Sequence, residues 1–360
     1  MKNRNEKLSL ALKDLKLDAL FITKYVNQRY LEGFTGHDCF LLASAAGNFL
    51  IADSRYTEMA ERECAAAKIV PHRAPHPPLE EVAARLAREA GFKRIGFEAA
   101  HMTYSQYESI SKALSAGGVS MTSTTGAVEK IRAIKEPEES RMTEKACGVA
   151  DRALEELLKI LKPGVSELDV RTELDYLLKR GGAEDVAFET MALFGSRASQ
   201  PHANSSRDVI LSQGDFILID YGATVNGYKS DTTRTFVCGR ADPEQKRAYD
   251  TVRYAQAESL ALVKPGANGR DVNDRAIGIL KGAGFPPFEY GIGHGVGLEI
   301  HEEPFMRQKT DITLEPGMIL TVEPGIYIPS WGGIRIEDTV LVTEDGHKVL
   351  TNFTKELIEL

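Results

Sequence analysis

Residues 216–237 have the sequence Phe-Ile-Leu-Ile-Asp-Tyr-Gly-Ala-Thr-Val-Asn-Gly-Tyr-Lys-Ser-Asp-Thr-Thr-Arg-Thr-Phe-Val. Two β-rich runs flank the Asn-Gly pair at 226–227, which is the strongest short-range signal for a β-hairpin. In the register that this turn sets, Asp220 faces Thr233, and Asp231 lies on the same face, diagonal to Asp220. Aspartate is depleted in strands, and a lone charge at the end of a buried apolar run is costly. We therefore predict a hairpin whose two carboxylates converge on a shared partner, rather than two solvated strand residues.

A second stretch, residues 289–304, surrounds a histidine with glycine: Glu-Tyr-Gly-Ile-Gly-His-Gly-Val-Gly-Leu-Glu-Ile-His-Glu-Glu-Pro. Four glycines in seven residues let backbone approach backbone around His294. A lone histidine is usually structural, but His301 follows seven positions later. The glycine spacing is weak evidence for dinucleotide binding, because no βαβ unit follows it.

The third stretch, residues 318–342, is Met-Ile-Leu-Thr-Val-Glu-Pro-Gly-Ile-Tyr-Ile-Pro-Ser-Trp-Gly-Gly-Ile-Arg-Ile-Glu-Asp-Thr-Val-Leu-Val. It predicts two strands joined through the Gly-Gly pair, with Glu323 at the end of the first and Glu337 inside the second. Strand alternation places Arg335 and Glu337 on one face. Glutamates in apolar strands need partners, as the two aspartates do.

A metal centre would provide partners for all three stretches together. Four carboxylates carry four negative charges, which two divalent cations neutralise. A site of carboxylates and one imidazole favours Mn²⁺, Co²⁺, Fe²⁺ or Zn²⁺ over a metal that prefers thiolate. Two-metal sites hold a bridging water or hydroxide as nucleophile and polarise a scissile carbonyl. The residues alone therefore predict a dimetal hydrolase.

Composition excludes several other classes of protein. The 360 residues are 42% hydrophobic and 27% charged, which is ordinary globular usage and excludes a disordered or fibrous chain. A formal net charge of −8, without a Lys/Arg block, argues against nucleic acid or an anionic membrane as the main partner. We find no long apolar run typical of a membrane span and no signal-peptide pattern. The four cysteines are scattered, so buried thiols and a cytoplasmic location are expected.

The pattern along the chain predicts two domains. Short apolar runs alternate with amphipathic stretches in the first third, which indicates an α/β layer domain. A charged junction falls near residues 130–138. Beyond it the pattern is strand-rich from about residue 189, and helices are predicted at 138–162, 166–181, 243–263 and 268–282.

A proline-rich run at residues 71–78 is predicted to be a loop, because proline supplies no donor and restricts its predecessor. His72 and His76 have metal-like i, i+4 spacing within it. Prolines forbid the helix that would align the two rings, so we do not predict a metal site there.

The chain resembles the pita-bread metallopeptidases, a family that includes aminopeptidase P, prolidase and methionine aminopeptidase. The motifs that carry this resemblance are Pro201-His202, the Asp220…Asp231-Thr-Thr-Arg-Thr hairpin, Gly293-His294-Gly-Val-Gly-Leu-Glu-Ile-His301-Glu, Thr321-Val-Glu323-Pro-Gly-Ile-Tyr, Gly333-Ile-Arg335-Ile-Glu337-Asp, Tyr30-Leu-Glu-Gly-Phe-Thr-Gly and Ala52-Asp53-Ser-Arg55-Tyr56. The resemblance covers essentially the whole chain. It implies an α/β accessory domain of creatinase/prolidase type at 1–132. It also implies an α+β pita-bread catalytic domain with a curved antiparallel sheet at 133–360.

The resemblance also implies a role for each candidate metal ligand. Asp231 and Glu337 resemble the carboxylates that bridge the two metals. Asp220 would complete one metal site, and His294 with Glu323 would complete the other. Glu323 would also take a proton from the bridging water.

Three further residues resemble the family's supporting groups. His202 and His301 match the histidines that steady the substrate carbonyl and the tetrahedral intermediate. Arg335 would hold a ligand carboxylate in its orientation, with a plain cross-strand salt bridge as the alternative.

Two positions depart from the family pattern. Tyr290 stands where relatives often carry a further histidine, and a phenol is a poor proton shuttle at neutral pH. Dipeptidases can place an arginine soon after the second histidine, whereas here Phe305 precedes Arg307. The second departure favours an aminopeptidase over a strict dipeptidase.

Taken together, the resemblance implies a metal-dependent exopeptidase that cleaves between a first residue and a following proline. The expected cofactors are two divalent ions, Mn²⁺ first, and the expected assembly is a homodimer. Two alternatives stay open. One is a creatinase-like amidinohydrolase that works without metal, and the other is a catalytically silent peptide-binding module of the same fold.

Overall fold

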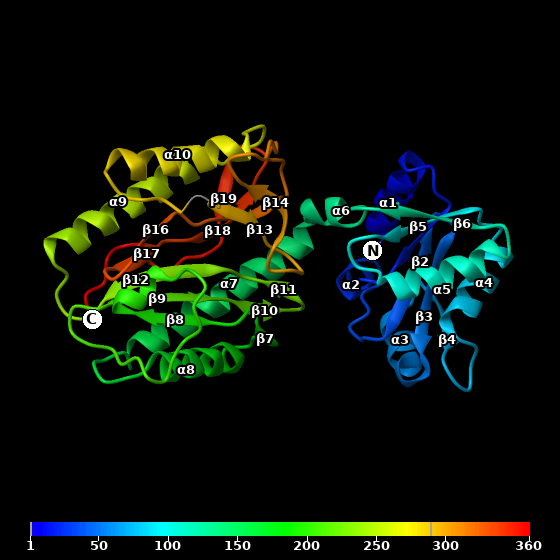
Figure 1. The fold of residues 1–360 in the computed structure, drawn as a ribbon, viewed down its shortest axis with the longest axis horizontal. Coiled ribbons are helices and arrows are strands. Elements are labelled where there is room, and N and C mark those ends of the chain that lie inside the picture. Colours follow the sequence, from blue (N-terminus) through cyan, green and yellow to red (C-terminus); the bar gives the residue numbers. More distant parts are fainter. Residues whose placement is uncertain (1, 289) are drawn as a thin grey trace. The chain divides into compact units, whose positions relative to one another are not determined.

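The computed structural model describes residues 2–288 and 290–360, so Glu289 of the second quoted stretch lies outside it. The chain divides into two compact units, Met1–Arg132 and Ala133–Leu360 (Figure 1). Within the described residues, no helix is both long enough and apolar enough to cross a membrane.

The first unit contains a mixed six-stranded sheet with the strand order β4-β3-β2-β1-β5-β6. The central strand β1 pairs antiparallel with β2 and parallel with β5. The strands are β1 (Ala19–Ile22), β2 (Cys39–Ser44), β3 (Gly47–Asp53), β4 (Lys68–His72), β5 (Arg94–Glu98) and β6 (Ser120–Thr124).

Helices cover this sheet, as the predicted α/β class requires. An apolar cluster joins α4 and α5 to the strands, with Leu86 and Leu114 packed among Phe21, Ile51 and Ile95. In Figure 1, α4 and α5 lie side by side. The helices are α1 (Lys2–Asp14), α2 (Tyr25–Glu32), η1 (Ser54–Tyr56), α3 (Thr57–Glu63), α4 (Leu79–Glu89), α5 (Tyr104–Ser115) and α6 (Glu129–Ala133).

The prediction of a loop over the whole proline-rich run is wrong at its first two residues. Pro71 and His72 belong to β4 and pair with Ala52 and Asp53 of β3. β4 is an edge strand, where the donor that proline lacks is not needed by a further neighbour.

The second unit contains four small antiparallel sheets, with strand orders β11-β10-β7, β12-β9-β8, β14-β13-β15-β18-β19 and β16-β17. A 3₁₀ helix, η2 (Gly195–Ser199), follows β8. The strands are β7 (Asp185–Val186), β8 (Met191–Phe194), β9 (Phe216–Tyr221), β10 (Ala223–Val225), β11 (Tyr228–Lys229), β12 (Thr232–Val237), β13 (Gly293–Gly295), β14 (Glu302–Met306), β15 (Ile319–Val322), β16 (Gly325–Ile328), β17 (Gly332–Arg335), β18 (Asp338–Val342) and β19 (His347–Val349).

Two pairs of helices pack on these strands from opposite sides (Figure 1). All four predicted helices are present, within a few residues of the predicted ends: α7 (Pro137–Leu158), α8 (Glu167–Arg180), α9 (Pro243–Leu260) and α10 (Gly269–Gly282). Their starts follow local chemistry. Ser166 caps α8 by accepting from the Asp169 amide, and Asp242 forms a capping box ahead of Pro243.

The predicted hairpin register is confirmed, because Asp220 of β9 pairs with Thr233 of β12. Ile217 and Ile219 pack in the apolar cluster with α7 and α8, whereas Leu218 packs in the cluster with α9 and α10. Side chains alternate along a strand, so Asp220 points to the same side as Leu218. This alternation places one charged side chain on an otherwise apolar face.

One prediction about the third stretch needs correction. Glu337 does not lie inside a strand; residues 336–337 form a break between β17 and β18. At this break the chain passes from the two-stranded sheet to the five-stranded sheet. The Glu337 amide donates to the Thr233 carbonyl at 3.2 Å, which fixes the break against β12.

Candidate active site

A cavity of the second unit has a volume of about 630 Å³. Every site residue predicted from the sequence lines it. These residues are His202, Asp220, Asp231, His294, His301, Glu323, Arg335 and Glu337.

Five separate segments bring the candidate metal ligands to this cavity, each at or beside a strand end. Asp220 lies near the end of β9, and Asp231 directly precedes β12. His294 is the middle residue of β13. Glu323 follows β15, and Glu337 lies between β17 and β18.

Glycine allows β13 to lie close enough to its neighbours to present His294. A Cβ on Gly293 would lie 2.1 Å from the Thr321 carbonyl oxygen, and one on Gly295 would lie 2.2 Å from that of Glu303. No side chain fits at these distances, so the expected close approach of backbones around His294 is confirmed.

Ligand atoms of Asp231, His294 and Glu337 all lie within 4.8 Å of one another. The His294 Nε2 atom is 3.5 Å from Asp231 Oδ2 and 3.3 Å from Glu323 Oε1. Its Nδ1 atom lies 3.1 Å from the Gly295 carbonyl, an acceptor, so Nδ1 carries a proton and Nε2 faces the carboxylates. Burial alone would lower the pKa of His294, but the Glu323 carboxylate outweighs it and the pKa is raised.

The remaining carboxylates crowd one another. Burial raises the pKa of Asp231 well above its ordinary value, and repulsion from Glu337 and Asp220 adds to the rise. Burial and repulsion from Glu323 raise the pKa of Glu337 in the same way. Burial also raises the pKa of Asp220, although Arg335 offsets part of the effect. The chain therefore does not supply enough positive charge to keep all of these carboxyl groups ionised.

Two carboxylate oxygens in this site have no hydrogen-bond partner among the described residues. Asp220 Oδ1 and Glu337 Oε1 are both inaccessible to solvent. Buried polar atoms are otherwise nearly always paired. Orphaned oxygens beside an imidazole nitrogen form an oxygen-rich donor set, and this set fits divalent cations.

Arg335 contacts the cluster from one side and is 5% exposed. It donates to Asp220 Oδ2, to Thr233 Oγ1 at 2.8 Å and to the Tyr327 hydroxyl at 2.6 Å. Its Nε atom is 4.0 Å from Glu323 Oε2. Arg335 therefore forms an ion pair with the candidate ligand Asp220, and its role in orienting that carboxylate stays a prediction.

The two further histidines flank the candidate ligands differently. The ring of His301 lies edge-on to that of His294, with 4.3 Å between centroids. Burial lowers the pKa of His301, so its ring is more readily neutral. His202 lines the cavity from an exposed position.

Several residues that line the cavity or contact its candidate ligands were not predicted. Thr233 Oγ1 donates to Glu337 Oε2 at 2.7 Å, and Thr321 Oγ1 donates to Glu323 Oε1 at 3.0 Å. Period-two alternation could have found both, since each threonine shares a strand face with a predicted ligand. No sequence signal marks the others, which are Phe188, Glu189, Met191, Asn204, Phe288 and Tyr327.

Both departures from the family pattern lie at this cavity. Tyr290 is 81% exposed, with its ring 5.2 Å from that of Phe288. The Arg307 guanidinium lies over the Phe305 ring at 4.4 Å, and both residues line the cavity. Arg307 is therefore close enough to meet a bound substrate although its spacing from His301 differs.

Two family models match the chain. Residues 141–344 match metallopeptidase family M24, and residues 4–134 match the creatinase/prolidase N-terminal domain. Among curated proteins, the Xaa-Pro dipeptidase of Pyrococcus furiosus is 35% identical over 361 residues, which cover 99% of this chain and 100% of that protein.

Solved structures with a similar fold cover nearly the full length of the chain. The Xaa-Pro dipeptidase from Bacillus anthracis has a TM-score of 0.94 and 36% identity, covering 100% of this chain and 99% of that chain. The X-Pro aminopeptidase from Thermotoga maritima MSB8 has a TM-score of 0.89 and 29% identity, covering 97% and 99%. The predicted fold class, an α/β N-terminal part followed by a pita-bread part, is confirmed.

Proposed function

This chain belongs to metallopeptidase family M24, and we propose that it is an exopeptidase that hydrolyses the bond between an N-terminal residue and a following proline. The observation that carries the proposal is the group of four carboxylates and one imidazole, each buried or half-buried, on a single cavity, with two carboxylate oxygens unpaired among the described residues. Relatives named Xaa-Pro dipeptidase and X-Pro aminopeptidase support the proline specificity.

Divalent metal ions are implied by the family, and we propose that two are held here, with Mn²⁺ as the first candidate. The residues that would hold them are Asp220, Asp231, His294, Glu323 and Glu337. When bound, the cations supply Lewis acidity, which acidifies a water molecule and polarises the scissile carbonyl.

The chain's own residues would supply the rest of the chemistry. Glu323 would accept the proton of the attacking water and pass it to the leaving amine, which balances the hydrolysis. His301 and His202 would donate hydrogen bonds to the carbonyl oxygen as negative charge develops on it. Arg335 would keep Asp220 in its orientation through the contact described above.

We also propose that residues 1–132 are the accessory domain and residues 133–360 the catalytic domain. The four cysteines are free and buried, which supports a cytoplasmic location. The homodimer is proposed on the family resemblance alone, and light scattering on the purified protein tests it.

The test of the activity is a side-by-side assay of metal-loaded protein on Xaa-Pro dipeptides and Xaa-Pro-Xaa tripeptides, with Xaa-Ala peptides as controls. Release of proline from the first, or of the N-terminal residue from the second, supports the proposal. No turnover of either substrate by protein that has bound Mn²⁺ contradicts it, and turnover of Xaa-Ala at the same rate contradicts the proline specificity.

The same assay decides the length preference. The departure at Phe305 favours an aminopeptidase, whereas the position of Arg307 in the cavity provides a cation that could hold the carboxylate of a dipeptide. The comparisons give no support to a creatinase-like amidinohydrolase or a silent binding module.

A further inference from the structure

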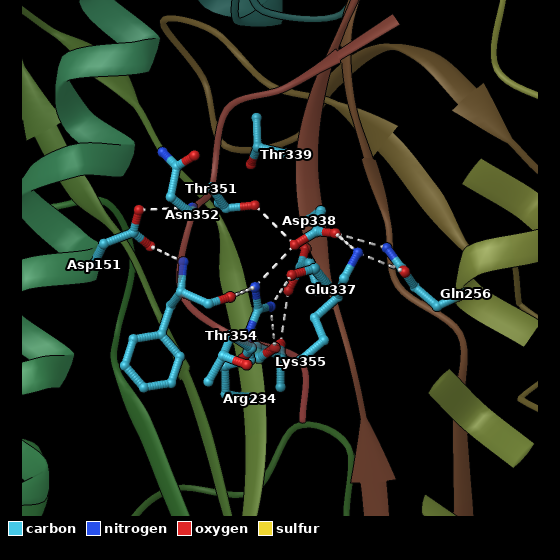
Figure 2. A network of polar contacts seen from close by, with 12 residues as sticks. Asp151, Arg234, Gln256, Glu337, Asp338, Thr339, Thr351, Asn352, Thr354 and Lys355 are labelled. Atoms are coloured by element: carbon cyan, nitrogen blue, oxygen red, sulfur yellow. Dashed lines mark hydrogen bonds and ion pairs between the residues drawn. The ribbon is translucent and has the colours of Figure 1, made fainter. Parts of the chain in front are cut away.

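A second buried group of charged and polar side chains lies next to the candidate metal ligands, outside the cavity. Its centre is Asp338, the residue after Glu337 (Figure 2). We call it the Asp338 cluster, and it consists of Arg234, Gln256, Asp338, Thr351 and Lys355. These residues come from β12, α9, β18 and the C-terminal segment after β19.

The Asp338 carboxylate has every acceptor position filled. Its Oδ1 atom accepts from Arg234 Nη2 at 2.9 Å and from Thr351 Oγ1 at 2.8 Å. Its Oδ2 atom accepts from Gln256 Nε2 at 2.9 Å and from Lys355 Nζ at 2.5 Å. Four donors from three segments, β12, α9 and the C-terminal segment, therefore fix one carboxylate.

The Arg234 guanidinium is equally saturated and is 1% exposed. Its Nη1 atom donates to the carbonyls of Thr233, at 3.0 Å, and of Glu337. Its Nη2 atom donates to Asp338 and to the Phe353 carbonyl, and its Nε atom donates to the Thr354 carbonyl at 3.1 Å. All five N–H donors of this side chain are used.

These contacts reach the backbone of two candidate metal ligands. Arg234 binds the carbonyl of Glu337 and that of Thr233, whose hydroxyl holds the Glu337 carboxylate inside the cavity. The Thr339 hydroxyl donates to the Asp231 carbonyl at 2.7 Å. The backbone that carries both Asp231 and Glu337 is therefore tied to β12 and β18 by side chains that do not face the cavity.

We propose that Arg234, Asp338 and Lys355 are positioning residues for the metal centre. Residues 351–355 of the C-terminal segment complete this supporting network through their contacts with Arg234 and Asp338. The inference rests on the proposed metal binding by Asp231 and Glu337. Arg234 sets the spacing between β12 and the chain break at Glu337. Asp338 holds Arg234 in place, and Lys355 holds Asp338. Metal affinity depends on the exact spacing of ligand atoms, so loosening this chain of contacts weakens binding without removing a ligand.

A stabilising role alone does not account for the arrangement. Replacing a buried ion pair by apolar side chains is often neutral or stabilising, so charge is not needed merely to fill the space. The five donors of Arg234, in contrast, tie β12 to residues 337–338 and 353–354 at fixed angles, which no apolar side chain does.

The experiment measures Mn²⁺ affinity by calorimetric titration of metal-free full-length protein, with folding of each variant verified by circular dichroism. The variants are Arg234→Lys, Lys355→Met and Lys355→Arg. Lys348→Met is the matched control. Lys348 also lies near the C-terminus and also pairs with a carboxylate, but it is exposed and its partner is Glu144 rather than a member of the cluster.

We expect Arg234→Lys to weaken Mn²⁺ binding by about 10- to 100-fold, because one ammonium group cannot reach the acceptors at residues 233, 337–338 and 353–354 together. Lys355→Met should weaken binding by about tenfold, the low end of that range, because Asp338 keeps three donors. Lys355→Arg and Lys348→Met should bind within about twofold of the unchanged protein, since they retain or do not touch the contacts.

Two results would overturn the inference. If Arg234→Lys and Lys355→Met melt at lower temperature but bind Mn²⁺ like the unchanged protein, the cluster serves stability only. Lys355 is the partly exposed member, with a side chain 28% exposed, so its variant remains informative even if Arg234→Lys fails to fold. If the unchanged protein itself binds no divalent metal, the proposed function fails first, which distinguishes the two failures.

Discussion

Glu337 and Asp338 are neighbours in the chain and are each 1% exposed, but their carboxylates meet opposite surroundings. Glu337 enters the cavity, where Thr233 holds one oxygen and the other is unpaired among the described residues. Asp338 receives four hydrogen bonds, two of them from cations. Burial raises the pKa of both, yet that of Glu337 ends well above its ordinary value, whereas Arg234 and Lys355 bring that of Asp338 below it.

The difference teaches that burial alone does not identify a functional carboxylate. What distinguishes the two is whether the chain itself supplies the compensating donors and charge. Asp338 is complete without a ligand and serves to hold other groups. One oxygen of Glu337 has no donor among the described residues, and we propose that a cation from outside the chain supplies the compensation.

The substitution with the largest expected effect is Glu337→Gln, which tests whether Glu337 is needed for activity. The change removes a proposed bridging carboxylate but keeps the size and the contact with Thr233, so we expect kcat/KM for Xaa-Pro peptides to fall on the order of 10³-fold or more. The matched control is Glu344→Gln, which changes an exposed glutamate shortly after Glu337 in the sequence and should leave activity unchanged. Activity within tenfold of the unchanged enzyme would remove Glu337 from the site.

Asp338→Asn and Glu337→Gln should change the stability of the metal-free protein in opposite directions. Asp338→Asn leaves Arg234 and Lys355 without their shared carboxylate, and breaking a buried pair costs about 3–5 kcal/mol of the free energy of unfolding. Glu337→Gln should instead raise the unfolding midpoint of the metal-free protein, because it removes a buried carboxylate that Glu323 and Asp220 repel and that Arg335 and Thr233 compensate only in part. Thermal unfolding in EDTA compares the two, and a shift of both variants in one direction would contradict the distinction.

Metal addition should stabilise the unchanged protein and not Glu337→Gln. A ligand that binds only the folded state at 100 times its Kd adds about 2.7 kcal/mol. We expect Mn²⁺ to raise the unfolding midpoint, and EDTA to reverse the rise. Equal stabilisation of both proteins would mean that the metal binds elsewhere.

The smallest expected effect concerns His72, a buried titratable residue of the first unit. His72 is 4% exposed, its Nε2 atom has no partner among the described residues, and its neighbours are Asp38, Asp53 and Arg73. Burial lowers the pKa of His72 below its ordinary value of 6.5 in the folded chain. The unfolded chain therefore binds a proton first as pH falls, so His72 reduces stability below about pH 6.5.

His72→Asn should remove that contribution. Unfolding midpoints measured at pH 7.5 and 5.5 should differ less for this variant than for the unchanged protein. His76→Asn is the control, because His76 is an exposed histidine of the same run. If the control flattens the pH dependence equally, burial of His72 is not the cause.

Much of the catalytic unit could be predicted from sequence because its signals are local. The Asn-Gly turn and strand alternation fixed the register that pairs Asp220 with Thr233. Proline and capping residues marked the starts of α7, α8 and α9. An acidic residue in an apolar strand marked each candidate carboxylate, because its burial requires a partner wherever that partner lies.

The sequence by itself therefore determined the class of fold, the helix positions and which charged residues need explanation. Only the tertiary structure decided that Glu337 lies at a break between strands, that its neighbour Asp338 faces Arg234 and Lys355, and that Arg307 reaches the cavity. Arg234 and Asp338 are 104 positions apart. Local pattern reports which groups must find partners, whereas the identity of the partner depends on how distant segments pack.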